Sequence, residues 1–159
     1  IDDTSISFGM NAIKNIGAKA LEFIIAAREK DGPFNSLFDF TGRVDLQAVN
    51  KKVLESLIVS GSMDHLEGSR AEKVSTIEIA IRYGQNIQSE RNKNQVDLFD
   101  DSASGSGVSI IPNLQEVRPW PDGEALANEK EVLGLYLTGH PLLEYADDLE
   151  DFSNHDFTE

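Results

Sequence analysis

Apolar residues in the first third of the chain recur every three or four positions, the spacing of one face of a helix. The segment FGMNAIKNIGAKALEFIIAAREKDGP shows this repeat, and Gly32 and Pro33 end it. Its apolar positions are Ile13, Ile16, Ala20, Leu21, Ile24 and Ile25. The pattern predicts an apolar helix, a tight turn at residues 15–17 and a second helix that opens at Ala18.

Three further helices are predicted before residue 92. Ser36, with Asp39 three positions later, offers an N-cap for a short helix. The segment NKKVLESLIVSG has helical spacing and stops near Gly61. The segment SRAE, residues 69–72, is a capping box that opens a long helix. One apolar stripe of that helix comprises Val74, Ile77, Ile81 and Ile87. Because no segment alternates as a strand does, the predicted fold class is all-α.

The pattern changes after residue 89. The stretch SERNKNQVDLFDDSASGSG is polar and ends in a Ser/Gly-rich run typical of a linker. Three prolines within residues 112–121 then favour extended chain. We expect a helix from about residue 123 to 138 that ends at Gly139, and another that starts at Pro141. The second helix would carry one apolar face of Leu142, Tyr145, Leu149 and Phe152. We expect the two helices to pack on each other or back on the first domain.

Composition narrows the class of protein. With 159 residues, 40% of them hydrophobic, the chain suffices for one ordinary domain or a small domain with appendages. No apolar run is long enough to span a membrane and no leader pattern follows Ile1, so a cytoplasmic location is predicted. The chain has no cysteine, and the three histidines lie far apart, so neither disulfides nor a metal site is predicted.

Charge is spread unevenly along the chain. The net charge is -14, but residues 1–66 contain nine acidic and seven basic side chains, whereas residues 67–159 contain nineteen and seven. Phosphate attracts cations, so any contact with nucleic acid belongs in the first segment. The acidic remainder is expected to face solvent or a protein partner.

The turn at residues 15–17 is a candidate phosphate site. A helix that starts directly after it exposes unpaired backbone N–H groups at the positive end of the helix dipole. Gly17 lets a phosphate approach the backbone, Ile16 can point inward, and Lys14 and Lys19 flank the turn. This arrangement resembles the helix-hairpin-helix motif, with Asn15 where glycine is usual; asparagine tolerates a left-handed backbone better than most residues. A plain pair of antiparallel helices is the alternative.

A second turn in LIVSGSMDHL looks like a degenerate partner of the first. It follows a helix that bears Lys51 and Lys52, and its turn contains Gly61 and Ser62. Two such units typically bind the backbones of a DNA duplex without base-specific contacts. These four residues are the predicted second contact with DNA.

The segment QVDLF, residues 95–99, has the character of a short linear ligand. Leu98 and Phe99 supply two apolar anchors in polar surroundings, and Gln95 and Asp97 supply polar edges. Ordering such a segment costs entropy, so an affinity on the order of micromolar is expected for the peptide alone. The alternative is that Leu98 and Phe99 fold back onto the domain's own core.

These segments together resemble the C-terminal part of bacterial replicative DNA polymerase III alpha subunits, the C family of polymerases. The resemblance rests on FGMNAIKNIG, GPFNSLFDF, NKKVLESLIVSGSMD, NQVDLFDD and EKEVLGLYLTGHPL, in that order. It implies a tandem helix-hairpin-helix domain that binds the duplex backbone over residues 1–92. It also implies a linker over 93–121 with a motif, Gln95–Phe99, for the β sliding clamp. A helical connector over 122–159 would precede an oligonucleotide-binding barrel, and other polymerase III holoenzyme subunits are implied partners.

Catalysis is not predicted for this chain. Polymerases need acidic residues that hold two metal ions on a sheet-containing palm, and magnesium is implied only for the parent polymerase. The Asp pairs at residues 2–3, 100–101 and 147–148 lie in acidic stretches with no strand pattern, and His140 is expected to cap a helix. Two other functions stay open. One is a scaffold for replication subunits with purely structural hairpins, and the other is an enzyme on the same hairpin fold, such as a glycosylase or nuclease.

Overall fold

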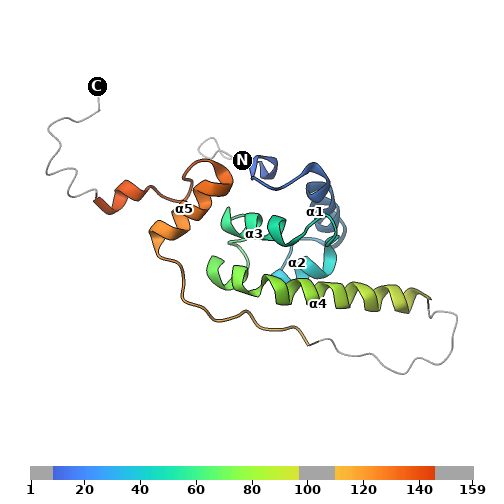
Figure 1. The fold of residues 1–159 in the computed structure, drawn as a ribbon. Coiled ribbons are helices and arrows are strands. Elements are labelled where there is room, and N and C mark those ends of the chain that lie inside the picture. Colours follow the sequence, from blue (N-terminus) through green and yellow to red (C-terminus); the bar gives the residue numbers. More distant parts are fainter. Residues whose placement is uncertain (1–8, 97–109, 146–159) are drawn as a thin grey trace, which may run out of the picture.

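The computed structural model describes residues 9–96 and 110–145, and this part of the chain contains helices and no strand. The five α-helices are α1 (Ala18–Asp31), α2 (Leu37–Arg43), α3 (Lys51–Val59), α4 (Arg70–Val96) and α5 (Asp122–Leu133). Two short 3-10 helices, η1 (Met10–Ala12) and η3 (Pro141–Tyr145), flank them. The all-α prediction is confirmed. Helices α1, α2 and α3 gather on one side of the long α4 (Figure 1).

Side-chain caps fix where the helices begin. The Ser36 hydroxyl accepts a hydrogen bond from the Asp39 amide at 3.0 Å, which confirms the predicted cap of α2. The predicted capping box of α4 is also confirmed. There the Ser69 hydroxyl accepts from the Glu72 amide at 3.2 Å, and the Glu72 carboxylate accepts from the Ser69 amide at 2.7 Å. Asn50, which the pattern did not single out, caps α3 through the Lys52 and Val53 amides.

Helix α4 is the element against which both α2 and α3 pack. Its buried face packs against α2 and α3, with Ile77 and Ala80 among the residues that complete the core. At Gly84 the helix comes so close to α2 that an added Cβ would lie 2.7 Å from the Thr41 carbonyl carbon. The Gln88 amide reinforces this contact by donating to the Thr41 carbonyl at 3.0 Å. Helix α4 continues through Val96, past the predicted end of the first domain at residue 92.

The chain returns to the first domain after residue 110. Residues 110–121 have no regular secondary structure, as the prolines predicted, and the Gln115 amide donates to the Thr76 hydroxyl of α4 at 2.8 Å. Leu114 packs against the core cluster. Helix α5 then packs on α3, so of the two expected arrangements α5 follows the return to the first domain. Figure 1 shows this path alongside α4 and up to α5.

Two predicted helix bounds are wrong. Helix α5 ends at Leu133 rather than near residue 138, because Gly134 adopts a left-handed conformation with φ 80° and turns the chain. The segment before the first hairpin is a single 3-10 turn, η1, rather than a longer apolar helix, and Ile13 after it is extended. The positions Leu149 and Phe152 of the predicted last helix lie outside the described residues, whereas Leu142 and Tyr145 lie in η3.

Candidate nucleic-acid interface

The first hairpin forms a sharp turn that is anchored inward and exposed outward. Ile13 and Ile16 are buried at 4% and 8% exposure and join the core. Asn15 between them adopts φ 69°, the left-handed conformation that asparagine tolerates. Its side-chain amide donates to the Ser56 hydroxyl of α3 at 3.0 Å, so it ties the turn to the domain. Asparagine here thus adds a contact that glycine could not make.

The N-terminal end of α1 is open to a ligand. Gly17 is the N-cap, and no side chain of the described residues caps the helix there. The first turn contains no acidic residue, and the first helical hydrogen bond runs from the Leu21 amide to the Gly17 carbonyl at 3.2 Å. An added Cβ on Gly17 would meet nothing within 4 Å, so this approach is clear. Helix N-termini of this kind bind anions such as phosphate.

Two lysines accompany this helix start. Lys14 and Lys19 are both exposed, like Asn15 and Gly17, so all four predicted residues of the first site are accessible at or next to the turn. The Lys19 ammonium lies 5.9 Å from the centre of the Phe23 ring, at the edge of cation–π range. The site therefore combines uncapped amides, a helix dipole and two exposed cations.

The four residues predicted for the second site do not converge. Lys51 and Lys52 lie at the start of α3, whereas Gly61 and Ser62 follow its end. A helix of nine residues is about 13 Å long, which separates the two pairs. The Lys51 ammonium bonds the Glu78 carboxylate at 2.7 Å, which raises the pKa of Lys51. The Lys52 ammonium lies 3.0 Å from the Glu55 carboxylate.

The turn after α3 differs from the first hairpin in its backbone. Gly61 has φ 81°, and its amide donates to the Ile58 carbonyl at 3.1 Å, so this glycine ends a helix rather than opening one. The Ser62 hydroxyl lies 2.9 Å from the Ser60 hydroxyl. The next long helix, α4, begins only at Arg70. These features agree with the description of this turn as a degenerate partner.

Sequence reasoning missed Arg70 and Glu129, which join the second turn to α5. The Arg70 guanidinium bonds Asp64 and the Val59 carbonyl, and its Nη1 lies 3.1 Å from a Glu129 carboxylate oxygen. Glu129 is fully buried although its sequence neighbours in α5 are mostly polar. One signal was present: Glu129 stands three positions after Leu126 and three before Val132, on the apolar stripe of its helix.

Hydrogen bonds keep the Glu129 carboxylate charged. Burial by itself raises the pKa of a carboxyl group, but the Thr138 and Leu137 amides donate to it at 2.9 and 2.6 Å. The Thr138 hydroxyl and Arg70 add two more bonds, and together these donors hold the Glu129 pKa below its ordinary value. The buried charge is therefore matched by a cation and three further donors.

The structure describes only the first two residues of the motif predicted to bind the clamp. Gln95 belongs to the last turn of that helix, whereas Asp97, Leu98 and Phe99 lie outside the described residues. The predicted role of Gln95–Phe99 therefore stays a prediction.

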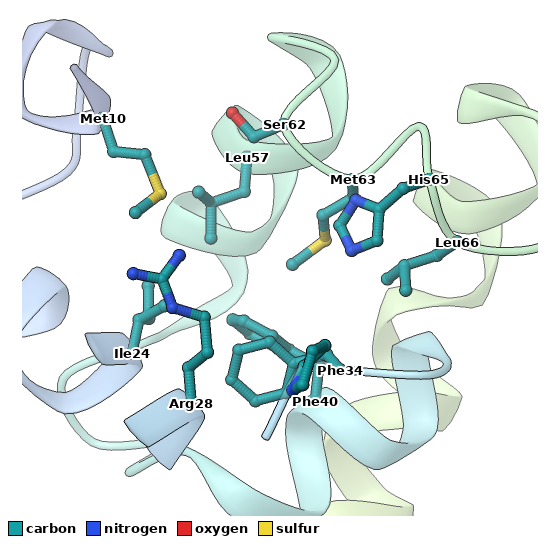
Figure 2. Close-up of a pocket in the computed structure, with 11 residues that line it drawn as sticks. Met10, Ile24, Arg28, Phe34, Phe40, Leu57, Ser62, Met63, His65 and Leu66 are labelled. Atoms are coloured by element: carbon teal, nitrogen blue, oxygen red, sulfur yellow. The ribbon is translucent and has the colours of Figure 1, made fainter. Parts of the chain in front are cut away.

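A cavity of about 360 Å³ opens between α1, α2 and the turn after α3 (Figure 2). Phe34, Phe40 and Met63 make its walls mostly apolar, and Arg28 and His65 add polar groups.

Within the described residues, no group of three His, Cys, Asp or Glu side chains is placed to hold a metal ion. The Asp pairs at 2–3, 100–101 and 147–148 lie outside that part of the chain. His140 accepts from the Leu142 amide at 3.2 Å, which confirms that it caps a helix, η3.

The comparisons with known proteins agree with this geometry. A family model for the helix-hairpin-helix motif matches residues 1–73. DNA polymerase III subunit alpha of Vibrio cholerae is 37% identical over 96% of this chain. The corresponding subunit of Escherichia coli K12 is 38% identical over 94% of the chain, and that of Thermus aquaticus is 38% identical over 88%. The chain is a homologue of one segment of DNA polymerase III subunit alpha.

The chain corresponds to a small part of each of these relatives. It spans 13% of the length of the Vibrio cholerae and Escherichia coli subunits. The resemblance read from the sequence motifs is thereby confirmed, together with the helix-hairpin-helix fold. None of the described helices is long and apolar enough to cross a membrane.

Proposed function

We propose that this chain is a non-catalytic module of a replicative polymerase that binds duplex DNA without regard to sequence. The observation that carries the proposal is the uncapped, exposed start of α1 at Gly17, flanked by Lys14 and Lys19. Its amides can bind one phosphate group, and a phosphate contact carries no base information. The relatives are named as DNA polymerase subunits, and the matching family model is a helix-hairpin-helix motif, which supports this assignment.

The second part of the proposal is attachment to a β sliding clamp through Gln95, Asp97, Leu98 and Phe99. A tether raises the effective concentration of the polymerase at the primer end, so weak contacts with DNA suffice for long synthesis. Other subunits of the holoenzyme would bind elsewhere on the parent. The acidic second half of the chain is consistent with protein partners rather than DNA, because like charges repel.

Duplex binding is tested by fluorescence anisotropy with a labelled duplex at several salt concentrations. Gly17→Ala should weaken duplex binding without disturbing the fold. Gly17 has φ -83° and open space around it, so alanine fits there but obstructs the approach of a phosphate. Lys19→Ala should weaken binding and reduce the steepness of the salt dependence by about one phosphate contact. The matched control is Lys30→Ala, an exposed lysine at the other end of α1. If Lys19→Ala and Lys30→Ala lose the same affinity for duplex DNA, the proposed phosphate site at the start of α1 is refuted.

Attachment to the clamp is tested by calorimetric titration against the sliding clamp of the same organism. Wild type should bind with a Kd on the order of micromolar, and Leu98→Ala/Phe99→Ala should abolish binding. The matched control is Leu142→Ala/Leu143→Ala, which removes two exposed apolar side chains elsewhere, 54% and 68% accessible. Binding that survives the first double variant would remove clamp attachment from the proposal.

One observation favours a second function, a scaffold for replication subunits. Both lysines at the start of α3 are already paired with carboxylates of the chain, which weakens a second contact with DNA. A scaffold with structural hairpins should show little affinity for duplex at any salt concentration. A DNA-binding module instead loses affinity steeply as salt rises. The anisotropy series above therefore separates the two functions.

A further inference from the structure

Helix α5 contacts both hairpin turns, although it lies far from them in sequence. At the first hairpin, the Lys14 amide donates to the Val132 carbonyl near the end of α5 at 2.9 Å. At the second turn, Glu129 of α5 pairs with Arg70 at 3.1 Å. The two α5 residues are three positions apart, so they lie within one turn of the same helix. One rigid element thus connects the two turns.

Arg70 transmits this connection to the second turn. Its guanidinium lies directly against Gly61, where an added Cβ would overlap its terminal nitrogen. The same group donates to the Val59 carbonyl at 3.2 Å and to Asp64 at 2.6 Å, on either side of Gly61. The Arg70 side chain is only 14% exposed, so water offers little replacement for these bonds. The position of Gly61 is therefore coupled to that of Glu129.

Glu129 is in turn held from several directions. It has no exposed surface and accepts bonds from the Leu137 and Thr138 amides as well as from Arg70. These bonds fold residues 134–138 back over α5, so the carboxylate cannot rotate away without leaving several donors unpaired. The bond from Arg70 thereby ties α5 to the start of α4, and the two amide bonds tie the segment after α5 to the same carboxylate.

We propose that α5 is a brace that sets the spacing of the two hairpin turns, and that Glu129 is a positioning residue for duplex binding. This inference rests on the proposed function and extends it, because it takes the second turn, whose lysines are paired with carboxylates, as a weaker contact with the same duplex. Two weak phosphate contacts reinforce each other only when the spacing of the two turns in the free protein already matches the spacing of phosphates on the duplex. Glu129 touches no DNA and acts through Arg70 and the backbone of α5.

The experiment compares Glu129→Gln with Glu124→Gln in the anisotropy assay. Both variants remove one negative charge from α5, and Glu124 is exposed in the first turn of that helix. Charge removal by itself favours DNA binding, so Glu124→Gln should bind as tightly as wild type or slightly tighter. Glu129→Gln should bind about fivefold more weakly, the lower end of coupling between sites. Equal affinity in the two variants overturns the proposal.

A second variant and a second measurement separate this proposal from the proposed function. Arg70→Lys keeps the net charge but loses the planar fork that bonds Glu129 and Asp64 together, so it should weaken binding in the same way. Hydrogen exchange of the Lys14 amide reports the docking of α5 without any DNA, because Val132 is its acceptor. If wild type fails to bind duplex, the proposed function fails. The brace is then supported if Glu129→Gln speeds that exchange relative to Glu124→Gln, and overturned if the rates are equal.

Discussion

Replacing Gly84 by alanine should destabilise the protein, although alanine favours helices over glycine. Gly84 lies inside α4, where the change would by itself stabilise the helix by about 1 kcal/mol. However, the new Cβ would lie 2.7 Å from the Thr41 carbonyl carbon of α2. Carbon atoms in contact prefer about 3.5 Å or more, so α2 has to move by roughly 1 Å. The sign of the effect depends on which contribution is larger.

In this structure the steric cost of the added Cβ is larger than the gain in helix propensity. Overpacking of this kind costs roughly 1–3 kcal/mol. The displacement also strains the two hydrogen bonds from the Gln88 amide to the Thr41 and Val44 carbonyls, at 3.0 and 2.8 Å, each worth about 1 kcal/mol. After subtraction of the helix term, the expected net loss is about 2 kcal/mol.

Gly42→Ala provides the matched control across the same interface. Gly42 is in α2, and an added Cβ there would meet Ile87 of α4 at 3.8 Å, which is ordinary contact. This variant should be as stable as wild type or more stable, by up to about 1 kcal/mol. Urea unfolding followed by far-UV circular dichroism measures both variants. If Gly84→Ala unfolds at the same or a higher urea concentration than Gly42→Ala, the close approach of α2 and α4 is refuted.

Three further predictions concern single side chains. Ser36→Ala should cost about 1 kcal/mol of unfolding free energy, because it removes the cap of α2, and unchanged urea unfolding would contradict that role. Arg43→Lys should cost about 2 kcal/mol in a thermal melt, since one ammonium cannot replace a fork whose Nη2 donates to the Ala27 and Gly32 carbonyls while its Nη1 donates to Asp39. The pKa of Glu129 is lowered in the folded state, so its stabilisation is complete above the ordinary carboxyl pKa of 4.5 and is lost as pH falls through the lowered value. Unfolding free energy measured from pH 7 to pH 3 should therefore fall less steeply in Glu129→Gln, and identical slopes would contradict this reasoning.

Local signals predicted most of the first domain. The cap at Ser36 and the capping box at Ser69 act through residues three positions away, so the sequence alone located the starts of α2 and α4. Buried Ile16 and left-handed Asn15 in the first hairpin follow from the same short-range reasoning.

The docking of α5 could not be predicted in this way. It depends on Arg70 and Glu129, which are 59 positions apart, and neither residue has a local partner that reveals the other. The end of α5 was also misplaced, because two glycines, Gly134 and Gly139, were available, and the pattern does not show that the Leu137 and Thr138 amides leave the helix to donate to Glu129. The second DNA site was predicted from residue types at both ends of α3, and the length of that helix separates them.

The length of α4 has a mechanical consequence for the segment that follows it. The helix has 27 residues and is therefore about 40 Å long, and it continues through Val96. Gln95, the first residue of the proposed clamp-binding segment, belongs to the last turn of this helix. A protein bound there would be held at a distance set by a stiff rod rather than by a coil. Adding or deleting one turn of α4 would shift that protein by about 5 Å along the rod, whereas single-residue changes would chiefly rotate it.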